Sequence, residues 1–128
     1  MIKILKKKKI LIFGAGSIGN HFSYAATKLG CKVYITDKSN ISLKRMKNKI
    51  FPKRYGKWNK DIIQLKYSKI FFKNKTLFDL IIIGTPPKSH LSLLSKIYNQ
   101  MSYKKILIEK PLASFKDNLN IIDKYKNQ

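Results

Sequence analysis

A glycine-rich turn near the amino terminus constrains the fold of this chain more than any other feature. An apolar run over residues 10–13 leads directly into Gly14-Ala15-Gly16-Ser17-Ile18-Gly19, and apolar residues at helical spacing follow it. A strand, a tight glycine turn and a helix start, in this order, are typical of a site for a dinucleotide pyrophosphate. The residues expected to bind that group are Gly14, Gly16, Ser17, Ile18 and Gly19.

The segment after the first helix indicates which dinucleotide is preferred. Residues 31–36 have the composition of a second strand, and Asp37 follows 18 residues after Gly19. An acidic residue at this place bonds the adenosine ribose hydroxyls in NAD-binding units, and it disfavours a 2′-phosphate. Asp37 therefore favours NAD, although Lys38 or Arg45 could serve the phosphate of NADP. The alternative is that Asp37 is a turn residue or the cap of a helix beginning near Ser42.

Strands and helices are expected to alternate along the rest of the chain. Apolar runs predict strands at 62–65, 80–83 and 105–108, and helical spacing predicts helices at 42–50, 89–101 and 119–125. Residues 51–58 are predicted to form a loop, because Pro52 and Gly56 interrupt the helical pattern. The pattern predicts an α/β fold: a Rossmann-type, doubly wound parallel sheet in the order 3-2-1-4-5, forming a single domain over residues 1–128.

The amino-acid composition narrows the classes of protein to which this chain could belong. One cysteine and two distant histidines argue against an internal disulfide and against a metal site. No apolar run approaches the roughly 20 residues that span a bilayer, so we expect a cytoplasmic protein without a membrane partner. The net charge of +22 comes from scattered lysines with only two arginines, whereas nucleic-acid interfaces favour arginine. We therefore expect weak, salt-dependent attraction to polyanions and no specific nucleic-acid partner.

Two further strand ends carry residues that suggest chemistry. The strand at 80–83 leads into Gly84-Thr85-Pro86-Pro87-Lys88-Ser89-His90, and the strand at 105–108 leads into Glu109-Lys110-Pro111-Leu112-Ala113. The carboxyl ends of parallel strands meet at one edge of the sheet, so both motifs should lie near the glycine turn. For His90 the alternative is a helix-start residue with local bonds, and for Glu109 and Lys110 it is a solvated charge pair.

The three motifs in this order resemble the amino-terminal domain of the Gfo/Idh/MocA oxidoreductases, and the resemblance covers essentially the whole chain. It implies NAD(P)-dependent hydride transfer at a secondary alcohol or ketone of a sugar-like or polyol-like substrate. It implies that Thr85 and Pro86 border the nicotinamide, that His90 lies near it or supports its loop, and that Glu109 contacts the cofactor ribose or Lys110. Lys110 corresponds to the family's catalytic lysine, and the bond before Pro111 is often cis.

The family's enzymes also carry a second domain, which binds the substrate and forms most of the oligomer interface. The carboxy-terminal substrate domain is absent from residues 1–128, so we expect the chain alone to be inactive and to need a missing or separate substrate domain. A full-length form could be oligomeric. Two other classes remain open, namely a stand-alone NAD-sensing regulatory module and a basic polyanion-binding protein.

Overall fold

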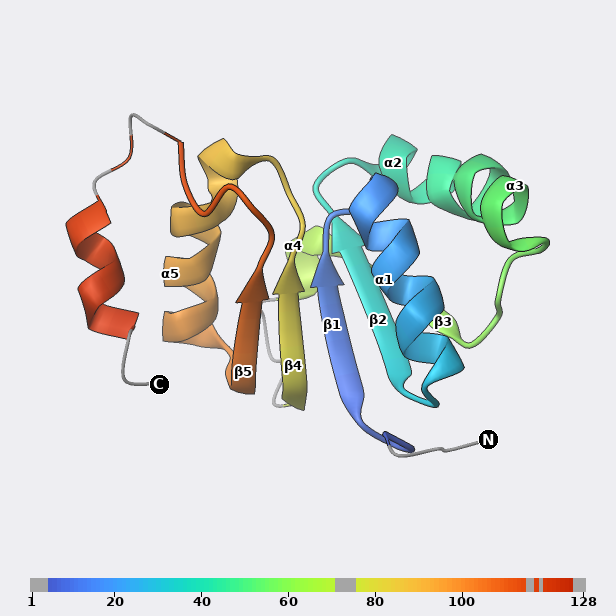
Figure 1. Cartoon of the computed structure of the whole chain (residues 1–128), viewed down its shortest axis with the longest axis horizontal. Coiled ribbons are helices and arrows are strands. Elements are labelled where there is room, and N and C mark those ends of the chain that lie inside the picture. Colours follow the sequence, from blue (N-terminus) through green and yellow to red (C-terminus); the bar gives the residue numbers. More distant parts are fainter. Residues whose placement is uncertain (1–4, 71–75, 115–116, 118, 126–128) are drawn as a thin grey trace.

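A five-stranded parallel sheet forms the centre of the protein in the computed structural model, which describes residues 5–70, 76–114, 117 and 119–125. The strands lie in the order β3-β2-β1-β4-β5, with every neighbouring pair parallel (Figure 1). Their bounds are β1 Lys9–Phe13, β2 Lys32–Asp37, β3 Ile62–Lys66, β4 Leu77–Ile83 and β5 Ser102–Ile108. The doubly wound α/β architecture predicted from the sequence is confirmed.

The apolar content of the strands explains this order. In β1, Leu11 pairs with Tyr34 of β2 on one side and with Ile81 of β4 on the other. Residues 10–13 are all buried, as is most of β4 towards its carboxyl end. A continuous apolar strand is stable only where both faces of the sheet are covered, which places β1 and β4 at the centre.

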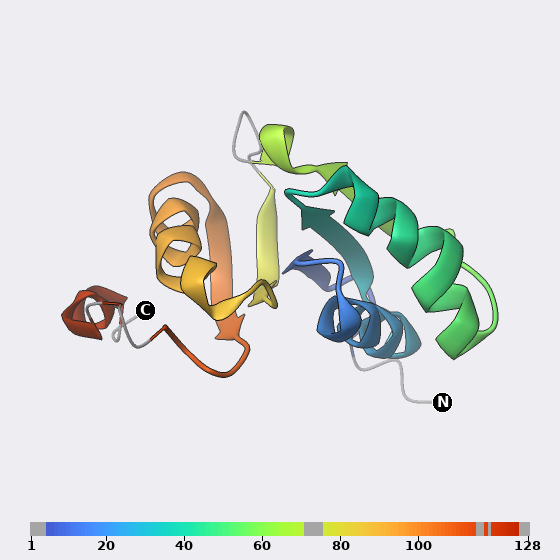
Figure 2. The same cartoon turned by 90° about the horizontal axis from the view of Figure 1, so that it is seen from above.

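Helices cover both faces of the sheet (Figure 2). One core cluster joins Ala26, Leu43 and Phe51 to the sheet, and the other joins Leu93 and Ile97 to its opposite face. The helices are α1 Ser17–Lys28, α2 Asn40–Arg45, η1 Met46–Ile50, α3 Phe51–Tyr55, α4 Tyr67–Ile70, η2 Pro87–Ser89, α5 His90–Gln100 and η3 Leu119–Tyr125. Within the described residues, no helix combines the length and the apolar character needed to cross a bilayer.

The predicted loop at 51–58 is wrong in its first half, because the helical path continues from α2 through η1 into α3. The segment η1 is a π-helical turn, in which the Phe51 N–H bonds the carbonyl of Met46. A wider turn directly before Pro52 reduces the clash between a proline ring and the preceding helical turn. The helix ends where Gly56 adopts a φ of +99°. The predicted final helix is also different, since residues 119–125 form a 3₁₀ helix.

Candidate dinucleotide-binding site

Backbone hydrogen bonds bring the three sequence motifs to the carboxyl edge of the sheet. The Gly14 N–H donates to the carbonyl of Thr36 at 2.8 Å, and the Gly84 N–H donates to the carbonyl of Phe13 at 2.8 Å. On the next strand, the Glu109 N–H donates to the carbonyl of Ile83 at 2.9 Å. The turns after β1, β4 and β5 therefore begin as neighbours on one edge, where ligands bind in open α/β sheets.

The glycines of the first turn meet different spatial demands. Gly14 has a φ of +107°, and a Cβ there would lie 2.7 Å from the carbonyl oxygen of Gly84. A Cβ on Gly19 would overlap the carbonyl oxygen of Gly14. At Gly16 a Cβ would meet no atom within 4 Å. Packing within the protein thus explains Gly14 and Gly19, whereas Gly16 faces open space at the start of α1.

The first turn of α1 has the electrostatic character of an anion site. Gly16 is its N-cap, makes no side-chain cap bond, and is followed by no acidic residue in the first turn. The initial N–H groups of a helix have no partner within the helix, and they lie at the positive end of its dipole. An anion placed there is stabilised by both effects.

Asn20 holds this turn in place, and the sequence reasoning missed it. Its side chain is fully buried, and Nδ2 donates to the carbonyls of Ala15 at 3.2 Å and Gly16 at 2.7 Å. The available signal was a polar residue at an inward position of an amphipathic helix. Asn20 therefore acts as a positioning residue for the glycine turn.

Asp37 connects the glycine turn with the segment after β2. Its Oδ2 accepts the Ala15 N–H at 2.8 Å, and its Oδ1 accepts the Ser39 N–H at 2.8 Å. It is not the helix cap, because Ser39 is the N-cap of α2 and its Oγ accepts the Ser42 N–H at 3.2 Å. An ionised carboxylate offers about four acceptor positions, so Asp37 retains capacity for ribose hydroxyls.

A cavity of about 270 Å³ lies between these turns. Four of the predicted residues line it, namely Gly14, Asp37, Thr85 and Pro86. Apolar parts of its wall come from Phe13, Tyr67 and Leu93. An apolar wall beside one carboxylate suits an adenosine, whose base is flat and whose ribose donates hydrogen bonds. Gly16, Ser17, Ile18 and Gly19 do not line this cavity, and they adjoin it through Gly14.

Three lysines, Lys38, Lys88 and Lys96, also line the cavity. The ammonium groups of Lys38 and Lys96 lie 5.4 and 6.0 Å from the ring centroid of Tyr67. Burial raises the pKa of the Tyr67 phenol above its ordinary value, so this ring stays neutral. The lysines give the cavity a positive potential, which favours a ligand that carries negative charge.

His90 joins the turn after β4 to the segment after β5. Its side chain is buried, with Nε2 2.6 Å from the carbonyl oxygen of Thr85 and Nδ1 3.1 Å from that of Leu112. His90 does not line the cavity, and its contacts combine a local one with Thr85 and a long-range one with Leu112. The neighbouring Ser89 hydroxyl bonds Thr85 Oγ1 and the carbonyl of Pro86, both at 2.7 Å, and thereby holds the same turn.

The segment after β5 places the predicted catalytic residue at the edge of this region. Lys110 is exposed, Glu109 is half-buried, and neither lines the cavity. The Lys110–Pro111 peptide bond is cis, as the family resemblance implied. The structure thus brings both residues to the correct edge of the sheet without placing them in the adenosine-sized cavity, and their chemical roles stay predictions.

The arrangement of sheet, turn and cavity defines a Rossmann-like α/β domain. No model of a known protein family matches the chain. The curated protein sequences likewise contain no match to it.

Similar folds do occur among solved structures. The L-tryptophan dehydrogenase from Nostoc punctiforme superposes with a TM-score of 0.59 and 12% identity, over 94% of this chain and 32% of the dehydrogenase. TrmK of M. capricolum, in complex with S-adenosyl-homocysteine, superposes with a TM-score of 0.55 and 16% identity, over 84% of this chain and 48% of TrmK. A putative methyltransferase from Thermoplasma acidophilum superposes with a TM-score of 0.54 and 20% identity, over 84% of this chain and 42% of the methyltransferase. At these identities the likeness concerns the fold alone, and the chain spans 32% to 48% of the length of each neighbour.

Proposed function

We propose that this chain is the nicotinamide-dinucleotide-binding domain of an oxidoreductase that resembles the Gfo/Idh/MocA family. The observation that carries the proposal is the meeting of three motifs at one sheet edge. The glycine turn, the Thr85-Pro86 turn and the Glu109-Lys110 segment follow adjacent strands, and His90 bonds the second motif to the segment that continues the third. Three independent strand ends with these residues are far more specific than a glycine turn alone.

The residues around the cavity fit an adenine dinucleotide. The space in front of Gly16 is open to a pyrophosphate, and Asp37 offers free acceptor positions to a ribose. Thr36 lines the cavity, and its buried Oγ1 has no hydrogen-bond partner among the described residues. In this proposal the pyrophosphate is held by the first turn of α1. Asp37 favours NAD, and NADP is the alternative because Lys38 could bind its 2′-phosphate.

The proposed reaction is hydride exchange with a secondary alcohol or ketone of a sugar-like substrate. The nicotinamide supplies or accepts the hydride when it is bound. Lys110 is the proposed catalytic residue, because an ammonium group beside the reacting oxygen stabilises the alkoxide that develops as a hydride leaves the carbon. Thr85 and Pro86 are proposed to form the wall beside the nicotinamide. The remaining substrate contacts are assigned to a second domain, in the same protein or in a partner.

Nucleotide titration tests the cofactor part of this proposal. We expect NADH or NADPH to bind saturably, with the nicotinamide fluorescence as the readout, and S-adenosyl-homocysteine to compete poorly. The Asp37→Ala variant should weaken NADH binding about 10-fold or more, since a charge-assisted hydrogen bond to the ribose is lost. Tighter binding of S-adenosyl-homocysteine would instead indicate a methyltransferase domain, and no binding of any nucleotide would reject the proposal.

Site-resolved labelling tests the part assigned to Lys110. An amine-reactive reagent is applied with and without saturating NADH, and each lysine is followed by peptide mass spectrometry. We expect NADH to protect Lys110, while the exposed Lys47 on η1, which does not line the cavity, serves as the control. Equal labelling of Lys110 in both states, in a chain that binds NADH, would favour the alternative of a regulatory NAD-sensing module.

A further inference from the structure

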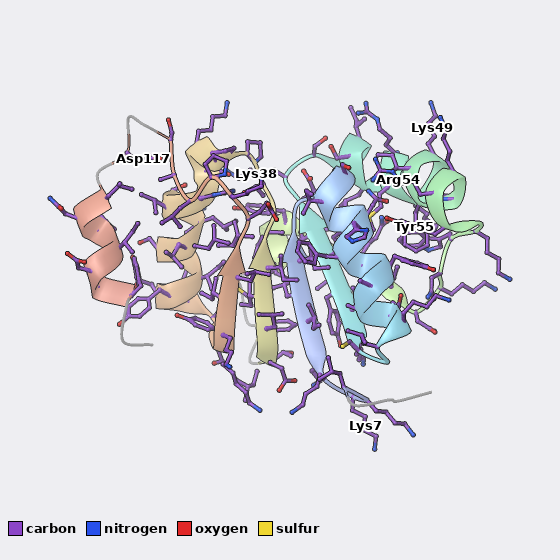
Figure 3. The ribbon with its side chains drawn as sticks, viewed as in Figure 1. Lys7, Lys38, Lys49, Arg54, Tyr55 and Asp117 are labelled. Atoms are coloured by element: carbon purple, nitrogen blue, oxygen red, sulfur yellow. The ribbon has the colours of Figure 1, made fainter. Side chains whose placement is uncertain are left out.

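Arg54 lies beside the first turn of α1, although it is 37 residues away in the sequence. It belongs to α3, and its Nη1 donates to the carbonyl oxygen of Ser17 at 3.2 Å. Figure 3 shows the side chain between α3 and the amino-terminal half of α1. Arg54 is exposed, and within the described residues its guanidinium donates this hydrogen bond to Ser17. This contact places one of the two arginines of the chain next to the proposed pyrophosphate position.

The bond to the Ser17 carbonyl favours the guanidinium locally, whereas the helix dipole disfavours a cation at this end of α1. The amino terminus of α1 already carries the positive end of the helix dipole, and its first turn holds no acidic side chain. The chain as a whole has a net charge of +22, which adds to the repulsion. An arrangement of this kind becomes favourable when an anion lies between the helix terminus and the guanidinium.

Packing of neighbouring aromatic residues fixes the position of α3, the helix that carries Arg54. The neighbouring Tyr55 stacks on Tyr24 of α1, with ring centroids 4.2 Å apart and planes at 7°. The Tyr55 hydroxyl lies 3.4 Å from Nδ1 of His21, and Phe51 packs edge-on against both Tyr55 and Trp58. These contacts hold α3 along α1, so the arginine is presented to the helix start by a built interface.

Two further features lie near the glycine turn, one at Gly16 and one in the adjoining cavity. Gly16 borders open space where a side chain would meet nothing within 4 Å. The fully buried Thr36 lines the adjoining cavity, and its Oγ1 lacks a hydrogen-bond partner among the described residues. A buried hydroxyl without a partner is costly, and a bound molecule would relieve that cost. The cavity meets the glycine turn at Gly14, so a dinucleotide bound in the cavity would reach the start of α1.

We propose that Arg54 is a phosphate-binding residue, whose guanidinium holds the pyrophosphate of the dinucleotide against the first turn of α1. This inference rests on the proposed function and deepens it, because the positive charge of Arg54 favours ligands that carry phosphate. The planar fork of arginine matches two phosphate oxygens, which lysine cannot reproduce. The same cation disfavours S-adenosylmethionine, which carries a positive sulfonium and no phosphate. Arg54 thus separates dinucleotides from the ligands of methyltransferases with a similar fold.

The test compares Arg54→Gln and Arg54→Lys with Lys53→Gln, which removes a neighbouring exposed cation from the same helix. NADH affinity is measured by nicotinamide fluorescence, and adenosine is used as a competitor that lacks phosphate. We expect Arg54→Gln to weaken NADH by 10- to 100-fold, Arg54→Lys to weaken it less, and Lys53→Gln to change it less than 2-fold. Adenosine affinity should stay constant in all three, and the salt dependence of NADH binding should become shallower in Arg54→Gln.

Two outcomes would overturn the inference. One is wild-type NADH affinity in Arg54→Gln, and the other is an equal loss of NADH and adenosine, which would indicate a general loosening of the site. Inorganic pyrophosphate separates this inference from the proposed function. If NADH fails to bind but pyrophosphate binds in an Arg54-dependent manner, the proposed function falls while the phosphate site stands. If the wild-type chain binds neither NADH nor pyrophosphate, both are rejected.

Discussion

Gly16 and Gly19 show that one residue type can serve packing at one position and ligand binding at another. Gly19 is excluded from carrying a side chain by the carbonyl of Gly14, whereas Gly16 has open space around it. Gly16 also has an extended backbone conformation with a φ of −81°, which every residue type can adopt. The two positions therefore respond differently to substitution.

Replacing Gly19 by alanine should destabilise the fold. The new methyl group meets backbone atoms that cannot move aside, so we expect the free energy of unfolding to fall by about 3 kcal/mol. The matched variant Gly16→Ser should keep or slightly raise stability, because serine is a better N-cap than glycine by a few tenths of a kcal/mol. Its hydroxyl should compete for the N–H groups of α1 and weaken NADH binding. Urea denaturation and NADH titration measure both effects, and equal stability of the two variants would contradict the packing argument.

His90 should contribute to stability because its buried ring lies between the carbonyls of Thr85 and Leu112. His90→Phe removes the ring N–H that donates to one of the carbonyls of Thr85 and Leu112, so we expect a loss of about 2 kcal/mol in urea denaturation. The control is His21→Phe, since His21 is exposed and its contact with the Tyr55 hydroxyl is long, at 3.4 Å. That variant should stay within about 0.5 kcal/mol of the wild type. A similar small effect at His90 would show that the two turns do not depend on it.

At the scale of elements, the amino ends of β1, β4 and β5 are joined by Asp79. Its Oδ2 accepts the Lys9 N–H at 2.8 Å, and its Oδ1 lies 3.0 Å from Lys104 Nζ and 3.6 Å from Lys8 Nζ. The backbone bond from Lys9, followed by the Lys104 bond, lowers the pKa of Asp79 from 3.8 to about 2. This edge is therefore stabilised by an ionised carboxylate, opposite the edge that carries the proposed site.

The stabilisation by Asp79 should depend on pH in a defined direction. A pKa that is lower in the folded state contributes stability above the unfolded value of 3.8, and this contribution is lost as the pH falls towards 2. We expect Asp79→Asn to have a lower urea midpoint than the wild type at pH 7, and the difference to shrink steadily below pH 4. Asp61→Asn, in an exposed turn, is the control. A midpoint difference that persists unchanged at pH 2 would argue against the ionic origin.

The prediction of the elements from sequence succeeded where the local pattern and the tertiary environment agree. The strands and the helix after the glycine turn have strong apolar periodicity, which the core enforces from both faces. The continuation through Pro52 was not predictable, because a proline and a glycine normally mark a loop. Burial of Phe51 against α1 and the sheet favours the helical path, and the π turn accommodates the proline. Tertiary packing outweighed the local signal there.

At the scale of the whole molecule, the large positive charge should produce weak binding to any polyanion. We expect a single-stranded oligonucleotide to bind at 50 mM salt and to lose most of its affinity by 200 mM, with no dependence on base sequence. Fluorescence anisotropy with two unrelated oligonucleotides measures this. Tight binding that survives at 200 mM salt, or a clear preference for one sequence, would instead favour a nucleic-acid function.

The amino-acid sequence by itself determined the class of fold and the edge at which a ligand can bind. Both follow from short-range rules, since strand order depends on apolar runs and crossover handedness, and the carboxyl ends of parallel strands must share one edge. Only the tertiary structure decided which residues meet there. It placed Arg54 on the first turn of α1, buried His90 between two turns, and directed both oxygens of Asp37 to backbone N–H groups. The contacts of Asp37 with Ala15, of Arg54 with Ser17 and of His90 with Leu112 join residues 22 to 37 positions apart. They depend on how helices and turns pack, which local periodicity does not specify.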